Sequence, residues 1–85
     1  METRVALIGI IVEDPASAEE MNSVLHEFAG YVIGRMGVPY RKRNINIISI
    51  AVDAPSNVIS SLAGKLGQIS GLTVKAAFSS HIYQD

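Results

Sequence analysis

The chain lacks the residues that most often stabilise or activate a small domain. None of its 85 residues is a cysteine, so neither disulfides nor thiolate metal ligands are available. Its only histidines, His26 and His81, are far apart in the sequence. A transition-metal site would therefore need ligands from several subunits or from carboxylates. We predict no metal site and no cofactor, which leaves self-association as the common reinforcement for so short a chain.

Charge of one sign and long apolar runs are also missing. Seven basic and eight acidic residues give a net charge of −1, whereas a free-standing nucleic-acid-binding domain is normally basic. Direct DNA binding is therefore not the expected activity. No apolar run is long enough to span a membrane, and a strand pattern begins without a preceding signal peptide. We expect a cytoplasmic protein with no membrane partner.

Catalytic motifs are scarce as well. No serine stands in a Gly-x-Ser-x-Gly context. The segment Gly64-Lys65-Leu66-Gly67 looks like part of a phosphate loop, but it lies at a predicted helix end, where N–H groups do not converge on an anion. We predict that the protein is not an enzyme. Catalysis by His26 with an acidic neighbour is the alternative.

Apolar residues, in contrast, are abundant. They make up 48% of the chain, and the mean hydropathy is positive. A chain of this size has more apolar surface than one small core can hide. The composition therefore predicts a buried interface between subunits.

One pattern occurs twice. Ile-x-Ile-x-Val-x-x-Pro fills residues 8–15 and again 48–55, and an acidic residue follows the valine in both copies. Each copy is typical of a strand end, a turn and a proline-led helix start, at which Asp14 can cap. The repeat predicts two β-α-β halves in one small domain.

The remaining patterns complete these halves. Strands are expected at 4–12, 31–38, 44–52 and 72–78. The apolar helix stripes are Met21, Val24, Leu25 and Phe28 in the first helix and Ile59, Leu62, Ala63 and Leu66 in the second. Gly34 and Gly37 suggest a bulge in the second strand, and Gly67 is expected to be a left-handed helix cap.

The order β-α-β-β-α-β predicts an α+β, ferredoxin-like fold: a four-stranded antiparallel sheet with two helices on one face. Residues 1–80 would form the single domain and 81–85 a short tail. The first and third strands are apolar on both sides and should be central. The alternate sets that could face outward are Ile8, Ile10 and Val12, or Val5, Leu7 and Ile11. Either set leaves an aliphatic patch, which we interpret as an oligomer interface; partial cover by the tail is the alternative.

Basic residues cluster around the hairpin at 35–43. Arg35, Arg41 and Arg43 are candidates for binding an anion such as a nucleotide, a carboxylate metabolite or nucleic-acid backbone, and Tyr40 could stack on it. A soluble hairpin tip whose charges discourage edge association is the alternative. His26 should project from the first helix into solvent, and it completes the set of candidate ligand contacts.

Three segments carry a resemblance to a known family: Asn22-x-x-Leu25-His26-x-Phe28, Gly34-Arg35-Met36-Gly37-x-Pro39-Tyr40-Arg41 and Gly64-Lys65-Leu66-Gly67-Gln68. With the strand at 5–14, they resemble the small proteins labelled iron-only hydrogenase system regulators, over nearly the whole chain. The resemblance implies a ferredoxin-like fold related to ACT domains and to the C-terminal domain of nickel-responsive repressors. It also implies a transcriptional role near iron-only hydrogenase expression or maturation.

The repressor comparison does not extend to nickel. Those repressors bind nickel through a helix histidine, a His-x-His pair and a cysteine, and only His26 falls near one of these positions. Residues 35–46 contain neither histidine nor cysteine. Because a strand pattern begins at the start of the sequence, we also expect no DNA-binding headpiece. We therefore expect a homo-oligomeric sensor that binds a small-molecule effector or a partner protein at subunit boundaries; nucleic-acid binding through the hairpin at 35–43 is the alternative.

Overall fold

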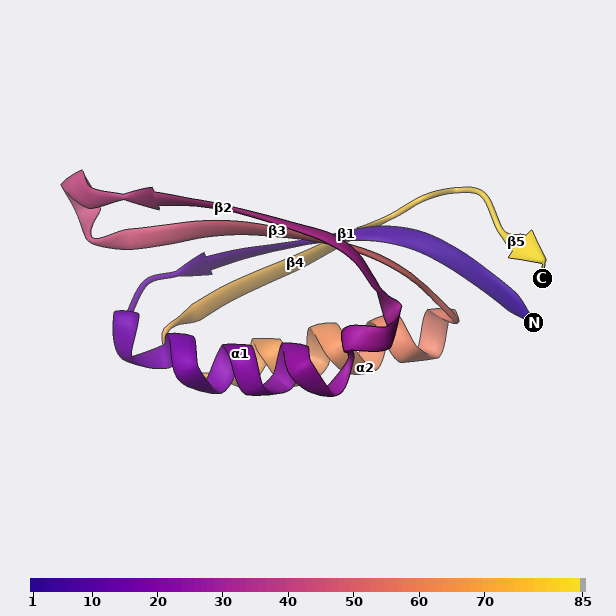
Figure 1. The fold of residues 1–85 in the computed structure, drawn as a ribbon, viewed down its shortest axis with the longest axis horizontal. Coiled ribbons are helices and arrows are strands. Elements are labelled where there is room, and N and C mark those ends of the chain that lie inside the picture. Colours follow the sequence, from indigo (N-terminus) through magenta and orange to yellow (C-terminus); the bar gives the residue numbers. More distant parts are fainter. Residues whose placement is uncertain (85) are drawn as a thin grey trace.

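An antiparallel sheet lies over two helices in the computed structural model, which describes residues 1–84 (Figure 1). The strands are β1 (Glu2–Val12), β2 (Val32–Tyr40), β3 (Ile45–Ala54), β4 (Leu72–Phe78) and β5 (Tyr83–Gln84). The helices are α1 (Ala18–Glu27) and α2 (Ser56–Gly67), with 3₁₀ turns η1 (Pro15–Ser17), η2 (Ala29–Tyr31) and η3 (Arg41–Arg43). The predicted ferredoxin-like order is confirmed.

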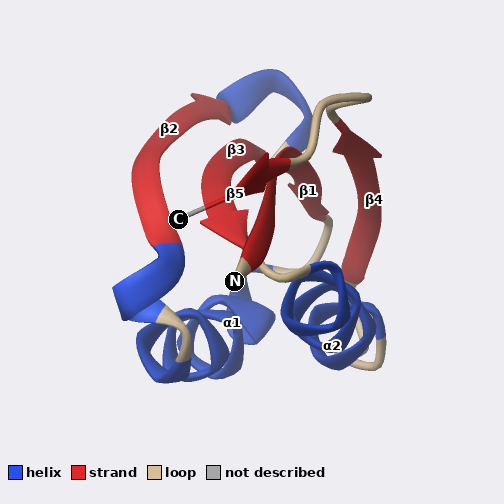
Figure 2. Ribbon diagram, turned by 90° about the vertical axis from the view of Figure 1, so that its right-hand side faces the viewer, coloured by secondary structure: helices blue, strands red, loops and turns tan. Residues whose placement is uncertain are grey.

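The strand order is β2-β3-β1-β4, so β1 and β3 are central as predicted. Figure 2 shows both helices on one side of the sheet, with β2 and β4 at its edges. The molecule is elongated, 43 × 19 × 17 Å. The β2–β3 hairpin lies at one end, and both chain ends lie at the other (Figure 1).

The core lies between the sheet and the helices. Ile8, Ile10 and Val12 of β1 are at most 1% exposed, and the corresponding residues of β3, Ile48, Ile50 and Val52, are buried beside them. From α1 the core receives Met21 and Leu25, and from α2 Ile59, Leu62 and Leu66. Side chains alternate along a strand, so the other set, Val5, Leu7 and Ile11, faces away from the helices. This decides the choice that the sequence left open.

The first helix begins as its sequence predicts. The Asp14 carboxylate accepts a hydrogen bond from the Ala16 N–H at 3.0 Å, and Pro15 is the first residue of η1. An acidic cap satisfies an N–H group that has no partner within the helix. The predicted bulge is also present, as a register shift between Val32 and Gly34 in β2.

The prediction for Gly67 was wrong. Helix α2 ends at Gly67, but Gln68 stays right-handed and its N–H bonds back to the Gly64 carbonyl. The left-handed residue is Gly71, with φ of 89°. Its carbonyl accepts the N–H groups of Glu13 at 2.7 Å and Asp14 at 3.3 Å. Through these two hydrogen bonds, the chain reversal after α2 is joined to the segment that precedes α1.

The end of the chain pairs with its beginning. Tyr83 and Gln84 of β5 lie opposite Thr3 and Glu2 of β1. The Ser79 N–H donates to the Val5 carbonyl at 2.8 Å, which guides the chain along β1. Part of the predicted tail at 81–85 is therefore a strand, and Asp85 lies outside the described residues.

Candidate functional site

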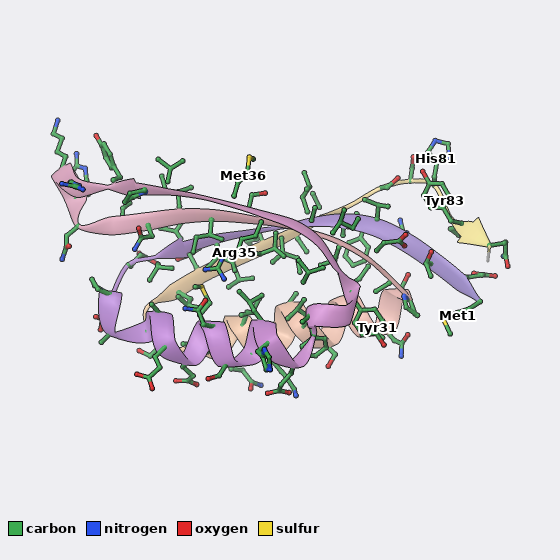
Figure 3. All side chains as sticks on the ribbon, in the orientation of Figure 1. Met1, Tyr31, Arg35, Met36, His81 and Tyr83 are labelled. Carbon is green, nitrogen blue, oxygen red and sulfur yellow. The ribbon has the colours of Figure 1, made fainter. Side chains whose placement is uncertain are left out.

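The sheet face opposite the helices carries large apolar side chains in contact with solvent. We call this surface the open face. Its exposed members are Leu7 (53%), Ile11 (38%), Met36 (72%), Val38 (61%), Tyr40 (42%) and Ile47 (47%). In Figure 3, Met36 points away from the helix layer while its neighbour Arg35 points toward it. Neither the helices nor β5 cover these residues.

Cross-strand pairing arranges the open face in rows. Ile11 lies opposite Ile47, which in turn lies opposite Val38, so one row is aliphatic across β1, β3 and β2. The next row contains Gly9, which has no side chain, opposite Ser49, and Gly9 lines a hollow of about 200 Å³ together with Ile11, Ile47, Thr73 and Lys75. A ridge beside a hollow is a shape that can interdigitate with an apolar surface of another chain.

Few charges interrupt this surface. Among the strand residues whose alternation places them on the open face, Asp53 at the end of β3 and Lys75 in β4 are the charged ones. One charge of each sign allows two copies of the face to meet without net repulsion. Charged side chains are depleted at the centres of interfaces, and this face has that composition.

A second candidate site lies on the helix side, between α1 and the edge strand β2. We call it the α1–β2 groove. It has a volume of about 370 Å³, and its lining is Asn22, Leu25, His26, Ala29, Val32, Arg35 and Ile50. Its polar members come from α1 (Asn22, His26) and β2 (Arg35), and its apolar members come from α1, η2, β2 and β3. Such a combination orients a small ligand through few polar contacts.

Arg35 is fixed across the mouth of the α1–β2 groove. Its Nη1 donates to Oδ1 of Asn22 at 2.9 Å, which joins β2 to α1. The same two side chains also line a neighbouring hollow of about 310 Å³ that extends along β2 to Gly37 and Pro39. The Arg35–Asn22 bond therefore separates two hollows on the inner side of β2.

The structure separates the candidate ligand contacts. His26 and Arg35 line the same groove. Tyr40 lies on the open face, and Arg41 and Arg43 are exposed in η3 at the hairpin tip. The five do not line one cavity within the chain. Their roles as ligand contacts stay predictions.

The spacing of two of these residues in the sequence already predicts that they lie on different faces of the sheet. Arg35 and Tyr40 are an odd number of positions apart in one strand, which places them on opposite faces. Asn22 was overlooked as a site residue. It precedes His26 by one helical turn, so both lie on the same side of α1 and both line the groove.

No group of three or more histidine, cysteine, aspartate or glutamate side chains within residues 1–84 is arranged to hold a metal ion. In the same part of the chain, no helix has the length and apolar character needed to cross a membrane.

Comparison with known proteins places the chain in a family. Residues 4–76 match the family model described as "TM1266-like: Iron-only hydrogenase system regulator, putative". The solved structure of the uncharacterized protein TM1266 from Thermotoga maritima has a TM-score of 0.85 and 34% identity. That comparison covers 89% of this chain and 96% of that one.

A more distant match shows the fold alone. Formyltetrahydrofolate deformylase from Pseudomonas putida KT2440 has a TM-score of 0.64 and 13% identity, over 91% of this chain and 29% of that one. No curated protein matches the sequence. The 34% identity over nearly the whole length, together with the family match, is decisive: the chain belongs to the TM1266-like family of iron-only hydrogenase system regulators.

Proposed function

We propose that the protein is a non-enzymatic regulatory domain that works as a homo-oligomer and binds a small-molecule effector or a partner protein. The open face is the observation that carries this proposal. Its aliphatic row, Ile11, Ile47 and Val38, is 38–61% exposed in the single chain. Fully burying one aliphatic side chain contributes about 1.5–3 kcal/mol, so covering this row and its neighbours is a large gain for a small domain.

Family membership supports the regulatory part of the proposal. The family is described by its link to the iron-only hydrogenase system, and we propose that this chain acts on that system through a partner protein. An effector bound in the α1–β2 groove would contact both α1 and β2, so it is placed to change how the edge strand meets another chain.

Native mass spectrometry of the purified protein tests the proposal directly. The expected result is an oligomer at micromolar concentration that dissociates when an acidic residue is placed on the open face. A monomer at that concentration would contradict the assembly, and a reaction catalysed by the purified protein would contradict the non-enzymatic role.

A second candidate function has one observation in its favour. Arg41, Lys42 and Arg43 are all exposed in η3, at the tip of the β2–β3 hairpin. Three phosphate contacts would give a slope of about −2.7 for log affinity against log salt. Fluorescence anisotropy with labelled duplex DNA measures that slope, and the absence of binding at about 50 mM salt removes this candidate.

A further inference from the structure

Among the described residues, no acidic side chain forms an ion pair with Arg35. The ion pair of the described residues joins Lys65 to Glu27, away from this site. The guanidinium of Arg35 instead bonds the neutral amide oxygen of Asn22. Glu19 lines an adjoining hollow on the outer side of α1, but it is not part of the α1–β2 groove. The groove therefore has one fixed positive charge.

The bond between Arg35 and Asn22 also sets which polar groups remain available. Because Oδ1 of Asn22 accepts a hydrogen bond from Nη1 of Arg35, the Nδ2 group of Asn22 is left as a donor. The remaining N–H groups of the guanidinium are donors as well, and an arginine has no acceptor. Two neighbouring donors, one of them charged, match the oxygens of a carboxylate.

Apart from Arg35, Asn22 and His26, the lining of the α1–β2 groove is apolar. Leu25, Ala29, Val32 and Ile50 provide methyl and methylene groups next to the donors. The volume of about 370 Å³ is at the small end of ligand pockets. An inorganic anion would leave these apolar side chains in contact with water, whereas a ligand with a short branched hydrocarbon group would cover them.

The edge strand explains why the neighbouring hollow, on the far side of the Arg35–Asn22 bond, is open. On the inner side of β2, the positions after Arg35 are Gly37 and Pro39, which offer no long side chain to close the gap to α1. A Cβ at Gly37 would meet only Ile48, at 3.7 Å. The open space is thus built by the sequence of β2.

We propose that the α1–β2 groove binds a small monocarboxylate with a short branched aliphatic body. Arg35 and Asn22 hold the carboxylate, and Leu25, Val32 and Ile50 contact the hydrocarbon. This site names a ligand class for the regulatory domain, and its biological role rests on the proposed function.

NMR titration of the intact protein with 4-methylpentanoate tests the site. The backbone amide signals of Asn22, His26, Val32 and Arg35 should shift and saturate, with a dissociation constant in the millimolar range. Arg35→Gln should weaken binding about tenfold or more, because it removes a charge-assisted contact. Lys65→Gln removes a positive charge from α2, outside the groove, and should leave binding unchanged.

The neutral probe 4-methylpentanamide and inorganic phosphate complete the experiment. Neither should shift the groove signals as 4-methylpentanoate does, because one lacks the charge and the other lacks the hydrocarbon. Equal binding of the amide, equal weakening by Lys65→Gln, or no saturable shift in the groove would overturn the proposal.

A second variant keeps the test informative if Arg35→Gln does not fold. Ala29→Leu leaves the donors in place and fills the apolar part of the groove, so it should abolish binding; unchanged binding would overturn the proposal. Native mass spectrometry on the same sample separates the two hypotheses. An oligomer that ignores 4-methylpentanoate refutes this ligand and retains the assembly, whereas a monomer that binds it does the reverse.

Discussion

Substitution of Ile47 gives the sharpest test of the open face. Ile47 is central in the aliphatic row, between Ile11 and Val38, and it is 47% exposed in the single chain. Fully burying an isoleucine contributes about 1.5–3 kcal/mol, so the part still exposed represents about 1 kcal/mol per chain. In a symmetric dimer each copy would contribute one Ile47, so Ile47→Ala should raise the dissociation constant about 30-fold, or about 2 kcal/mol.

Ile47→Asp should act more strongly. An unpaired carboxylate buried in an apolar interface costs several kcal/mol beyond the lost contact, so this variant should be monomeric at micromolar concentration. The folded monomer should survive, because the side chain at position 47 is half in solvent without a partner. Ile47→Asp should destabilise the single chain by about 1 kcal/mol, because aspartate has a lower strand propensity than isoleucine.

Light scattering after size-exclusion chromatography measures the mass, and circular dichroism checks the fold. Ser61→Asp provides a matched control, since Ser61 is exposed in α2 on the other side of the sheet. It adds the same charge and should leave the mass unchanged. An Ile47→Asp protein with wild-type mass, or a wild-type protein that is already monomeric, would refute the reasoning.

Three further predictions concern stability, each measured by urea denaturation. Gly71→Ala should destabilise the fold by about 2–4 kcal/mol, because φ is 89° and the new Cβ would lie 2.8 Å from Cβ of Asp14. Its control, Gly64→Ala, should stabilise the fold by about 0.5–1 kcal/mol, because the new Cβ would meet no atom outside the backbone of its own helix within 4 Å. Asp14→Ala should cost about 1 kcal/mol through loss of the cap, and a change below about 0.3 kcal/mol would mean that the bond to Ala16 contributes little. Lys65→Met should change stability by less than about 1 kcal/mol, since its ion pair is exposed.

The strands and the fold class could be predicted because strand patterns and helix patterns follow one another along the chain in the regular order β-α-β-β-α-β. The inward set of the central strands could not, since Ile8, Ile10 and Val12 are no more apolar than Val5, Leu7 and Ile11. Only the position of the helices, which depends on the turns, decides between two aliphatic sets. Periodicity detects a strand that is buried on both sides, but not which side meets the helices.

The C-terminal end of β2 was predicted wrongly, for a different reason. The sequence predicts a strand that ends at residue 38 and a polar turn at residues 39–43. Strand β2 is at the edge of the sheet, where one side needs no partner, so Pro39 is tolerated and the strand runs to Tyr40. The pairing of β5 with the start of β1 joins the two ends of the sequence, and no local pattern reports it.

The candidate site was predictable only in part. The basic residues near the hairpin are close in sequence, which suggested a single anion site. Strand alternation sends Arg35 inward and Tyr40 outward, while the turn carries Arg41 and Arg43 to the tip. Only Arg35 and His26 share a cavity, since that requires the helix and the edge strand to pack together.

The elongated shape has a practical consequence for studying an assembly. The hairpin tip and the paired chain ends occupy opposite ends of a molecule 43 Å long (Figure 1). The sequence contains no cysteine, so a single one introduced at either end can be labelled selectively. Like labels at the hairpin tips lie close together if two chains associate side by side in the same direction, and far apart if they run oppositely. The distance between equivalent spin labels on two associated chains therefore shows whether the chains run in the same or in opposite directions.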